Sequence, residues 1–145
     1  MMLTTKGRYA VMAIVDLSHY ETNGKAVALH EISNRQDIAI NYLEQLFNKL
    51  KARNLVESLK GPGGGYKLAK TARDISVLEV IDAVGESIKI TRCEESSGKG
   101  CLVKQNKICF THALWDGLGK QIRNYLGSIS LQDVCNNIKL KANLL

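Results

Sequence analysis

Residues 28–52, ALHEISNRQDIAINYLEQLFNKLKA, decide the fold that we expect for this chain. In residues 28–35, Leu29 and Ile32 recur at the spacing of a short helix. A tight connection through residues 37–40 leads into a second helix of about thirteen residues, which has one apolar face and one polar face. The pattern predicts a helix-turn-helix. The apolar face holds Leu43, Leu46, Phe47 and Leu50, and the polar face holds Asn41, Glu44, Gln45 and Asn48.

Two further helices are expected on either side of this motif. The first is capped by Thr4 or Thr5 and ends at the Asn23-Gly24 pair. The other opens with the capping box Ser76-Val-Leu-Glu79 and ends at Gly85. Their inward faces are expected to hold Ala10, Ala13, Ile14 and Leu17 in the first helix, and Val77, Val80, Ile81 and Val84 in the other.

A β-hairpin is expected directly after the helix-turn-helix. Its strand candidates, residues 55–60 and 66–69, are joined by Gly61-Pro62-Gly63-Gly64-Gly65, whose glycines permit positive φ. A nucleotide phosphate loop is disfavoured, because such a loop needs Lys and then Ser or Thr before a helix, whereas here an extended segment follows. A plain turn stays open, but next to a helix-turn-helix the hairpin is more simply a wing that faces DNA.

The second half of the chain has a loop and two helices. Residues 88–107 are polar and without periodicity, so Cys93 and Cys101 are expected on a loop of the length usually kept for function. A long helix is expected after Cys109, and a short terminal helix is capped at Ser130.

The long helix carries an apolar stripe that is too broad for the short elements around it to cover. A symmetric copy of the same helix is the natural partner, which predicts a twofold homodimer. Packing of the stripe against its own module is the alternative. The stripe consists of Leu114, Trp115, Leu118, Ile122, Tyr125 and Leu126.

Cys93, Cys101, Cys109 and His112 form the strongest candidate metal site. Seven residues separate each neighbouring pair of cysteines, and His112 follows Cys109 by three positions. If Cys109 lies in the first turn of the long helix, this step places both side chains on one face. Three thiolates and an imidazole can hold zinc or an iron–sulfur cluster. Because no close Cys-x2-4-Cys pair is present, the spacing favours the cluster and leaves zinc open.

The other interpretations of these residue types are less specific. Cys109 and His112 could act as a thiol nucleophile and its base, but no third orienting group is evident, so we do not expect an enzyme. Cys135 lies on the apolar face of the last helix and is expected in the core. His19 and His30 are expected to be surface or packed residues of the first two helices.

Charge and composition limit the class of protein. The net charge is +6, and residues 1–73 carry 11 Lys and Arg against 6 Asp and Glu, a net +5. A basic module is compatible with phosphate binding, although charge alone is weak evidence.

The longest apolar run, Tyr9 to Val15, is far shorter than the ~20 residues that span a bilayer. With four cysteines and no disulfide framework, we expect a cytoplasmic protein with reduced thiols and no membrane partner.

Four segments of the chain resemble the IscR-type family of iron–sulfur regulators, within the wider IscR/NsrR group of bacterial winged-helix transcription factors. They are LTTKGRYA (3–10), YLEQL (42–46), GPGGGY (61–66) and THALW (111–115), and their order also matches. The resemblance implies a homodimeric transcription factor, a repressor in this group, that binds a double-stranded DNA operator and regulates iron–sulfur assembly genes. It also implies a 2Fe–2S cluster on Cys93, Cys101, Cys109 and His112. A zinc-stabilised or metal-free winged-helix repressor is the alternative.

The expected fold class is mainly α with a small β-hairpin, and the chain divides into three parts. We expect a winged helix-turn-helix DNA-binding domain (1–85), a cluster-binding loop (86–110), and a dimerisation helix with a C-terminal helix (111–145). Our mechanistic hypothesis is that cluster occupancy orders residues 88–107 and the start of the dimer helix. This would shift the two recognition helices and thereby change operator choice.

Candidate DNA contacts lie at three places in the DNA-binding domain. The first is the start of the recognition helix, which is the second helix of the helix-turn-helix. It reaches base edges, where Gln can read adenine and Glu can accept from cytosine. Glu44 has a second interpretation, because Asn41-x-x-Glu44 resembles a capping box. The predicted base-reading residues are Asn41, Glu44 and Gln45; Tyr42 and Lys49 suit the DNA backbone; Lys60, Gly63 and Gly64 suit the wing; and Thr5, Lys6 and Arg8 are candidate phosphate anchors.

Overall fold

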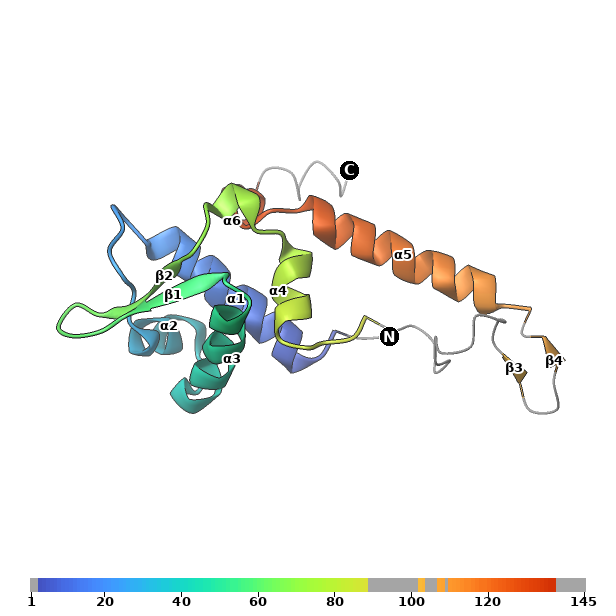
Figure 1. The fold of residues 1–145 in the computed structure, drawn as a ribbon, viewed down its shortest axis with the longest axis horizontal. Helices are drawn as coiled ribbons and strands as arrows, with labels where there is room; N and C mark the ends of the chain where they lie inside the picture. The colour runs from blue at the N-terminus through green and yellow to red at the C-terminus, as the bar shows by residue number, and fades with distance from the viewer. Residues whose placement is uncertain (1–2, 89–101, 104–106, 109, 138–145) are drawn as a thin grey trace.

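The computed structural model describes residues 3–88, 102–103, 107–108 and 110–137, and confirms a mainly helical fold with a small β-hairpin (Figure 1). A helical bundle surrounds α1, and α5 extends away from it (Figure 1). The elements are α1 (Thr5–Tyr20), α2 (Leu29–Gln36), α3 (Ile40–Ala52), β1 (Val56–Leu59), β2 (Gly65–Leu68), the 3-10 helix η1 (Ala72–Asp74), α4 (Val77–Ala83), β3 (Leu102–Val103), β4 (Lys107–Ile108), α5 (His112–Ser128) and α6 (Leu131–Asn136).

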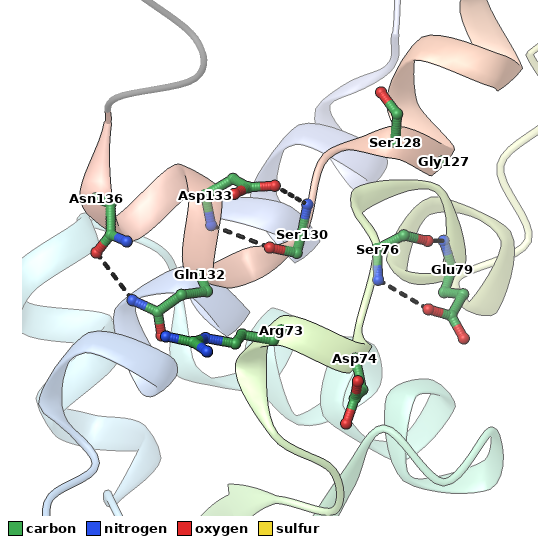
Figure 2. A pocket seen from close by; sticks show the side chains of 10 residues that line it. All are labelled: Arg73, Asp74, Ser76, Glu79, Gly127, Ser128, Ser130, Gln132, Asp133 and Asn136. Atoms are coloured by element: carbon green, nitrogen blue, oxygen red, sulfur yellow. Dashed lines mark hydrogen bonds between the residues drawn. The ribbon is translucent and has the colours of Figure 1, made fainter.

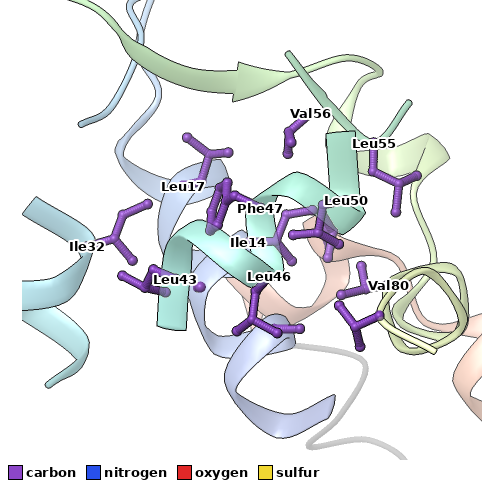
Figure 3. Packing of buried hydrophobic residues seen from close by; sticks show 14 of the residues in the cluster. Ile14, Leu17, Ile32, Leu43, Leu46, Phe47, Leu50, Leu55, Val56 and Val80 are labelled. Carbon is purple, nitrogen blue, oxygen red and sulfur yellow. The ribbon is translucent and has the colours of Figure 1, made fainter. Parts of the chain in front are cut away.

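The main hydrophobic core lies between α1 and α3 (Figure 3). Both faces that the sequence predicts to be apolar are buried, so the predicted helical periods are confirmed. Ile32 of α2, Val56 of β1 and Val80 of α4 close the core around these two helices (Figure 3). The buried residues of the two faces are Ala10, Ala13, Ile14 and Leu17 in α1, and Leu43, Leu46, Phe47 and Leu50 in α3.

The turn between α2 and α3 is fixed by one residue in the left-handed region and one side-chain bond. Asp37 ends α2 with φ 53°, a conformation that Asp adopts more readily than most side chains. The hydroxyl of Ser33 donates to the carbonyl oxygen of Ile38 over 2.6 Å, and the side chain of Ile38 is buried. The predicted helix-turn-helix is therefore confirmed, with the turn anchored in the core.

The wing is an antiparallel pair of strands that is also tied to the chain before α2. Val56 pairs with Leu68 and Leu59 with Gly65, so the turn falls on residues 60–64. Val27 and Tyr66 exchange two backbone hydrogen bonds of 2.8 Å. Gly65 has φ +148°, and a Cβ there would overlap the carbonyl of Val27, so this position requires glycine.

The C-terminal helix α6 packs against α1 and η1, although the sequence groups it with the dimerisation region. Leu131 is fully buried in the main core, and Cys135 is half-buried with its Sγ 3.7 Å from the Ser18 hydroxyl of α1. Ser76 and Ser130 form an antiparallel bridge, so the starts of α4 and α6 are joined. The sequence pattern did not predict β3, β4 or η1, because each is only two or three residues long.

Within the described ranges, none of the helices has the length and apolar character required to cross a membrane.

One ion pair, with a buried carboxylate, joins α1 to α2. The side chain of Asp16 is fully buried and accepts two hydrogen bonds from Arg35 Nε, at 3.2 and 3.0 Å, and one of 2.7 Å from Arg35 Nη2. Gln36 donates a further bond of 2.8 Å, and the guanidinium lies 3.8 Å from the ring centre of Tyr20. The hydrogen bonds and charge of Asp16 raise the pKa of Arg35 above its ordinary value. The pair therefore fixes α2 against the central helix.

We expect Asp16→Ala to lower the free energy of unfolding by about 2–4 kcal/mol. The change removes the carboxylate that accepts the hydrogen bonds of both Arg35 and Gln36, so both side chains lose their partner. Urea unfolding followed by circular dichroism would measure the change. Glu57→Ala is the matched control, since Glu57 forms only a surface pair with Lys67 and should leave stability nearly unchanged. Equal effects from the two variants would contradict the role assigned to Asp16.

Candidate DNA-binding surface and metal centre

The polar face of α3 is exposed along its whole length. Asn41, Glu44 and Gln45 are all exposed near its start, where a recognition helix meets base edges. Tyr42 is half-buried, and its ring lies edge-on to that of Tyr9, with 6.0 Å between the centroids. The structure thus leaves the three predicted base-reading side chains open and holds Tyr42 against α1.

The capping-box interpretation of Glu44 is wrong. The helix begins at Ile40 and its N-cap is Ala39, so Asn41 lies inside the first turn and cannot cap it. In the described part of the chain the Glu44 carboxylate has no hydrogen bond or ion pair. Glu44 is therefore available to a ligand.

Lys6 of α1 and Lys49 of α3 bring two ammonium groups together. The nearby ammonium group of Lys6 disfavours a second positive charge and lowers the pKa of Lys49 below its ordinary value. Thr5 and Arg8 are exposed on the same end of α1. Two like charges held side by side at a surface are stabilised by an anion between them, and a DNA phosphate is such an anion.

The wing tip offers one lysine and one open glycine. Lys60 and Gly63 are exposed. Gly64 is half-buried and donates its N–H to the carbonyl of Gly61 over 2.8 Å, so this amide is already used inside the turn. Of the two glycines predicted to face DNA at the wing, Gly63 is therefore the more accessible.

Of the four predicted metal ligands, only His112 lies among the described residues; Cys93, Cys101 and Cys109 lie outside them. His112 is the first residue of α5, and its Nδ1 is buried with no hydrogen-bond partner within the described ranges. α5 begins at His112, and the expected helical step from Cys109 to His112 depends on a residue that lies outside the described ranges. Among the described residues no group of three metal-binding side chains occurs.

The described hairpin bears on the spacing of two of the cysteines. Leu102 and Ile108 pair across β3 and β4, and they are the sequence neighbours of Cys101 and Cys109. The seven-residue gap between these cysteines thus begins and ends with paired residues. The two cysteines themselves lie outside the described residues.

Sequence reasoning missed Glu86, which is 9% exposed. Its Oε1 accepts a hydrogen bond from the backbone N–H of Thr4, 82 positions earlier in the chain. No local motif predicts such a contact. The only sequence signal is an acidic residue directly after the Gly85 that ends α4.

A polar pocket of about 640 Å³ lies between the starts of α4 and α6 (Figure 2). Ser76 and Ser130 point toward it, but each hydroxyl accepts a hydrogen bond of 3.1 Å from the backbone of its own helix. The carboxylates of Glu79 and Asp133 complete these caps. These four polar groups are therefore used to cap their own helices, and we do not take the pocket as a candidate site.

Comparison with known proteins identifies relatives over nearly the whole chain. The Rrf2 family, described as "Iron-dependent Transcriptional regulator", matches residues 3–137. The HTH-type transcriptional regulator IscR of Photorhabdus laumondii is 49% identical over 137 residues, which cover 94% of this chain and 80% of that protein. The structure of T. potens IscR has a TM-score of 0.75 at 32% identity, over 94% of this chain and 88% of that one. CymR, the global cysteine regulator of B. subtilis, shares the fold, with a TM-score of 0.77 at 23% identity over 94% and 98% of the two chains.

We expect Lys6→Ala and Lys49→Ala each to weaken binding to all duplex DNA sequences alike. Each should also reduce the slope of log affinity against log salt by about 0.9, the contribution of one phosphate contact. Fluorescence anisotropy over a range of salt concentrations measures both effects. Lys120→Ala is the control, because Lys120 pairs with Asp116 on α5, away from α3. A change in base preference without a change in slope would contradict the phosphate assignment.

Proposed function

Because the chain belongs to the Rrf2 family of iron-dependent transcriptional regulators, we propose that its binding to a DNA operator is controlled by a 2Fe–2S cluster and serves iron–sulfur assembly genes. The observation that carries this proposal is the extent of the family match. Residues 3–137 include the helix-turn-helix, the wing, all four candidate ligands and the long helix α5. The match to the family therefore covers the predicted cluster-binding loop as well as the DNA-binding fold.

The exposed surfaces of α3 and the wing support binding to duplex DNA. Asn41, Glu44 and Gln45 carry the donors and acceptors that distinguish bases in the major groove. Lys60 and the open tip at Gly63 suit the adjacent phosphates or minor groove. Tyr42 and Thr5, together with Arg8, Lys6 and Lys49, suit the DNA backbone, which sets the register of the recognition helix.

The apolar stripe of α5 supports a homodimer. No residue of α5 is buried in the described chain, and Leu114 and Leu118 are 61% and 42% exposed. In the described part of the chain, α5 contacts the helical bundle at the end that lies near α4. There Arg123 forms a two-pronged ion pair with Asp82. A second copy of α5 would bury the remaining stripe and place two recognition helices on half-sites about 34 Å apart.

The donor set fits a 2Fe–2S cluster held by Cys93, Cys101, Cys109 and His112. Thiolates are the usual ligands of such clusters, and imidazole can replace thiolate on one iron. The buried Nδ1 of His112, which lacks a partner among the described residues, fits a histidine placed for such a role. When bound, the cluster supplies a reversible indicator of iron–sulfur supply, and a histidine ligand makes its retention sensitive to protons.

Protein purified without oxygen is expected to be coloured and to contain iron and sulfide in equal amounts. His112→Ala should lose most of the cluster while keeping the far-ultraviolet circular dichroism of the fold, because His112 is only the first residue of α5. His30→Ala, on the exposed face of α2, is the matched control and should retain the cluster. A colourless, zinc-loaded dimer would instead favour the zinc-stabilised repressor.

Leu118→Glu is expected to convert the dimer to a monomer, because it places a charge in the centre of the apolar stripe. Light scattering coupled to size exclusion would report the mass. Asn124→Glu adds the same charge at an exposed position on the opposite side of α5 and should leave the dimer intact. If Leu118→Glu stays dimeric, α5 is not the dimer interface.

A further inference from the structure

We propose that Glu86 is a positioning residue that couples the cluster-binding segment to the phosphate contacts at the start of α1. This inference rests on the proposed function and assigns a route by which the cluster affects DNA binding. It concerns Glu86 and the first turn of α1, which hold none of the predicted cluster ligands or base-reading residues.

The start of α1 lacks the local groups that usually cap a helix. Its N-cap residue, Thr4, forms no side-chain hydrogen bond, and the first turn contains no acidic residue. The first bond inside the helix runs from Arg8 N–H to the Thr4 carbonyl over 3.2 Å. The earlier N–H groups therefore need acceptors from elsewhere, and the positive end of the helix dipole favours a negative charge there.

Glu86 supplies both the acceptor and the charge. Its Oε1 accepts the N–H of Thr4, and its Oε2 lies against Gly7, where an added Cβ would overlap the carboxylate. Oε2 is buried and accepts no hydrogen bond within the described residues, and the carboxylate forms no ion pair there. The start of α1 is therefore the main electrostatic partner of this buried charge, and Gly7 makes the approach possible.

The end of α4 holds Glu86 in this position. Gly85 adopts φ 73° and donates its N–H to Asp82, while the N–H of Glu86 bonds to the carbonyl of Ile81 over 3.3 Å. These two bonds form the usual glycine-terminated end of a helix. Glu86 is thus fixed on one side by α4, and its side chain reaches across to α1.

Glu86 is the first residue of the predicted cluster-binding loop, residues 86–110. Cys93 follows it by seven positions, and Ile88 packs against the same small hydrophobic cluster, Val77, Ile81 and Ile129, as Leu3, which lies just before α1. The same end of α1 carries Lys6. Its Nζ would lie 3.8 Å from a Cβ added at Gly85, and it also lies beside Lys49. A displacement at Cys93 on cluster binding would therefore reach the phosphate contacts through Glu86 and the first turn of α1.

The test compares Glu86→Gln and Glu86→Ala with Ser76→Ala. Glu86→Gln keeps the shape and one acceptor but removes the charge. Ser76→Ala removes a helix cap of the same kind at the start of α4, away from the start of α1. The probe is a duplex that the wild-type protein selects from a randomised library, and affinity is measured with and without the cluster over a range of salt concentrations.

For the wild type, we expect the cluster to change affinity by a factor in the range of about 5 to 150. Both Glu86 variants should bring this ratio close to one, and the salt slope of the cluster-free form should fall by about 0.9. Ser76→Ala should keep the wild-type ratio despite a lower melting temperature. Hydrogen exchange of the wild type requires no variant, and it should show that cluster loading changes protection of the amides of residues 4–7.

Wild-type ratios and slopes in both Glu86 variants would overturn the inference, as would a ratio lost equally in Ser76→Ala. Unchanged protection of residues 4–7 on cluster loading would overturn it as well. A wild-type protein whose DNA affinity does not depend on the cluster would contradict the proposed function itself, and this result is obtained before any variant is made.

Discussion

Close approach of helices to α1 is the constraint on which the other parts of the molecule depend. Gly7, Ala10 and Ala13 are buried along this helix, and α2, α3, α4 and α6 all pack against it. Small side chains allow short distances between helix axes, so a larger residue at any of these positions would push a neighbour outward. The recognition surface of α3, the carboxylate that follows α4 and the attachment of α6 are therefore positioned by the same helix.

The long helix is firmly joined to this bundle at one end. Arg123 pairs with Asp82 of α4, Gly127 lies against Leu78, and the bridge between residues 76 and 130 links the chain on both sides. These contacts hold the near end of α5 against the bundle. In a dimer formed through α5, a change in the angle between two such helices would move each recognition surface as a rigid body.

Much of the fold follows from local patterns in the sequence. The periods of α1 and α3, the capping box at Ser76 and the glycine-rich turn all involve residues within a few positions of one another, and the structure contains each of them. The contact of Glu86 with α1, the pairing of Lys6 with Lys49 and the packing of α6 on α1 join residues far apart in the chain, so no local period predicts them. The four candidate metal ligands are predicted from residue type and spacing, which define a donor set but not its geometry.

The two hydrogen bonds between Val27 and Tyr66 form a β-bridge that ties the chain before α2 to the wing. Because α2 begins two residues after Val27 and leads through the turn into α3, the wing cannot swing relative to the recognition helix without breaking the bridge. The span between the predicted base-reading residues of α3 and the tip of the wing is consequently constant. In the proposed dimer each protomer would therefore cover a fixed length of DNA, and a change in operator choice would have to arise from the distance between half-sites or from the strength of backbone contacts.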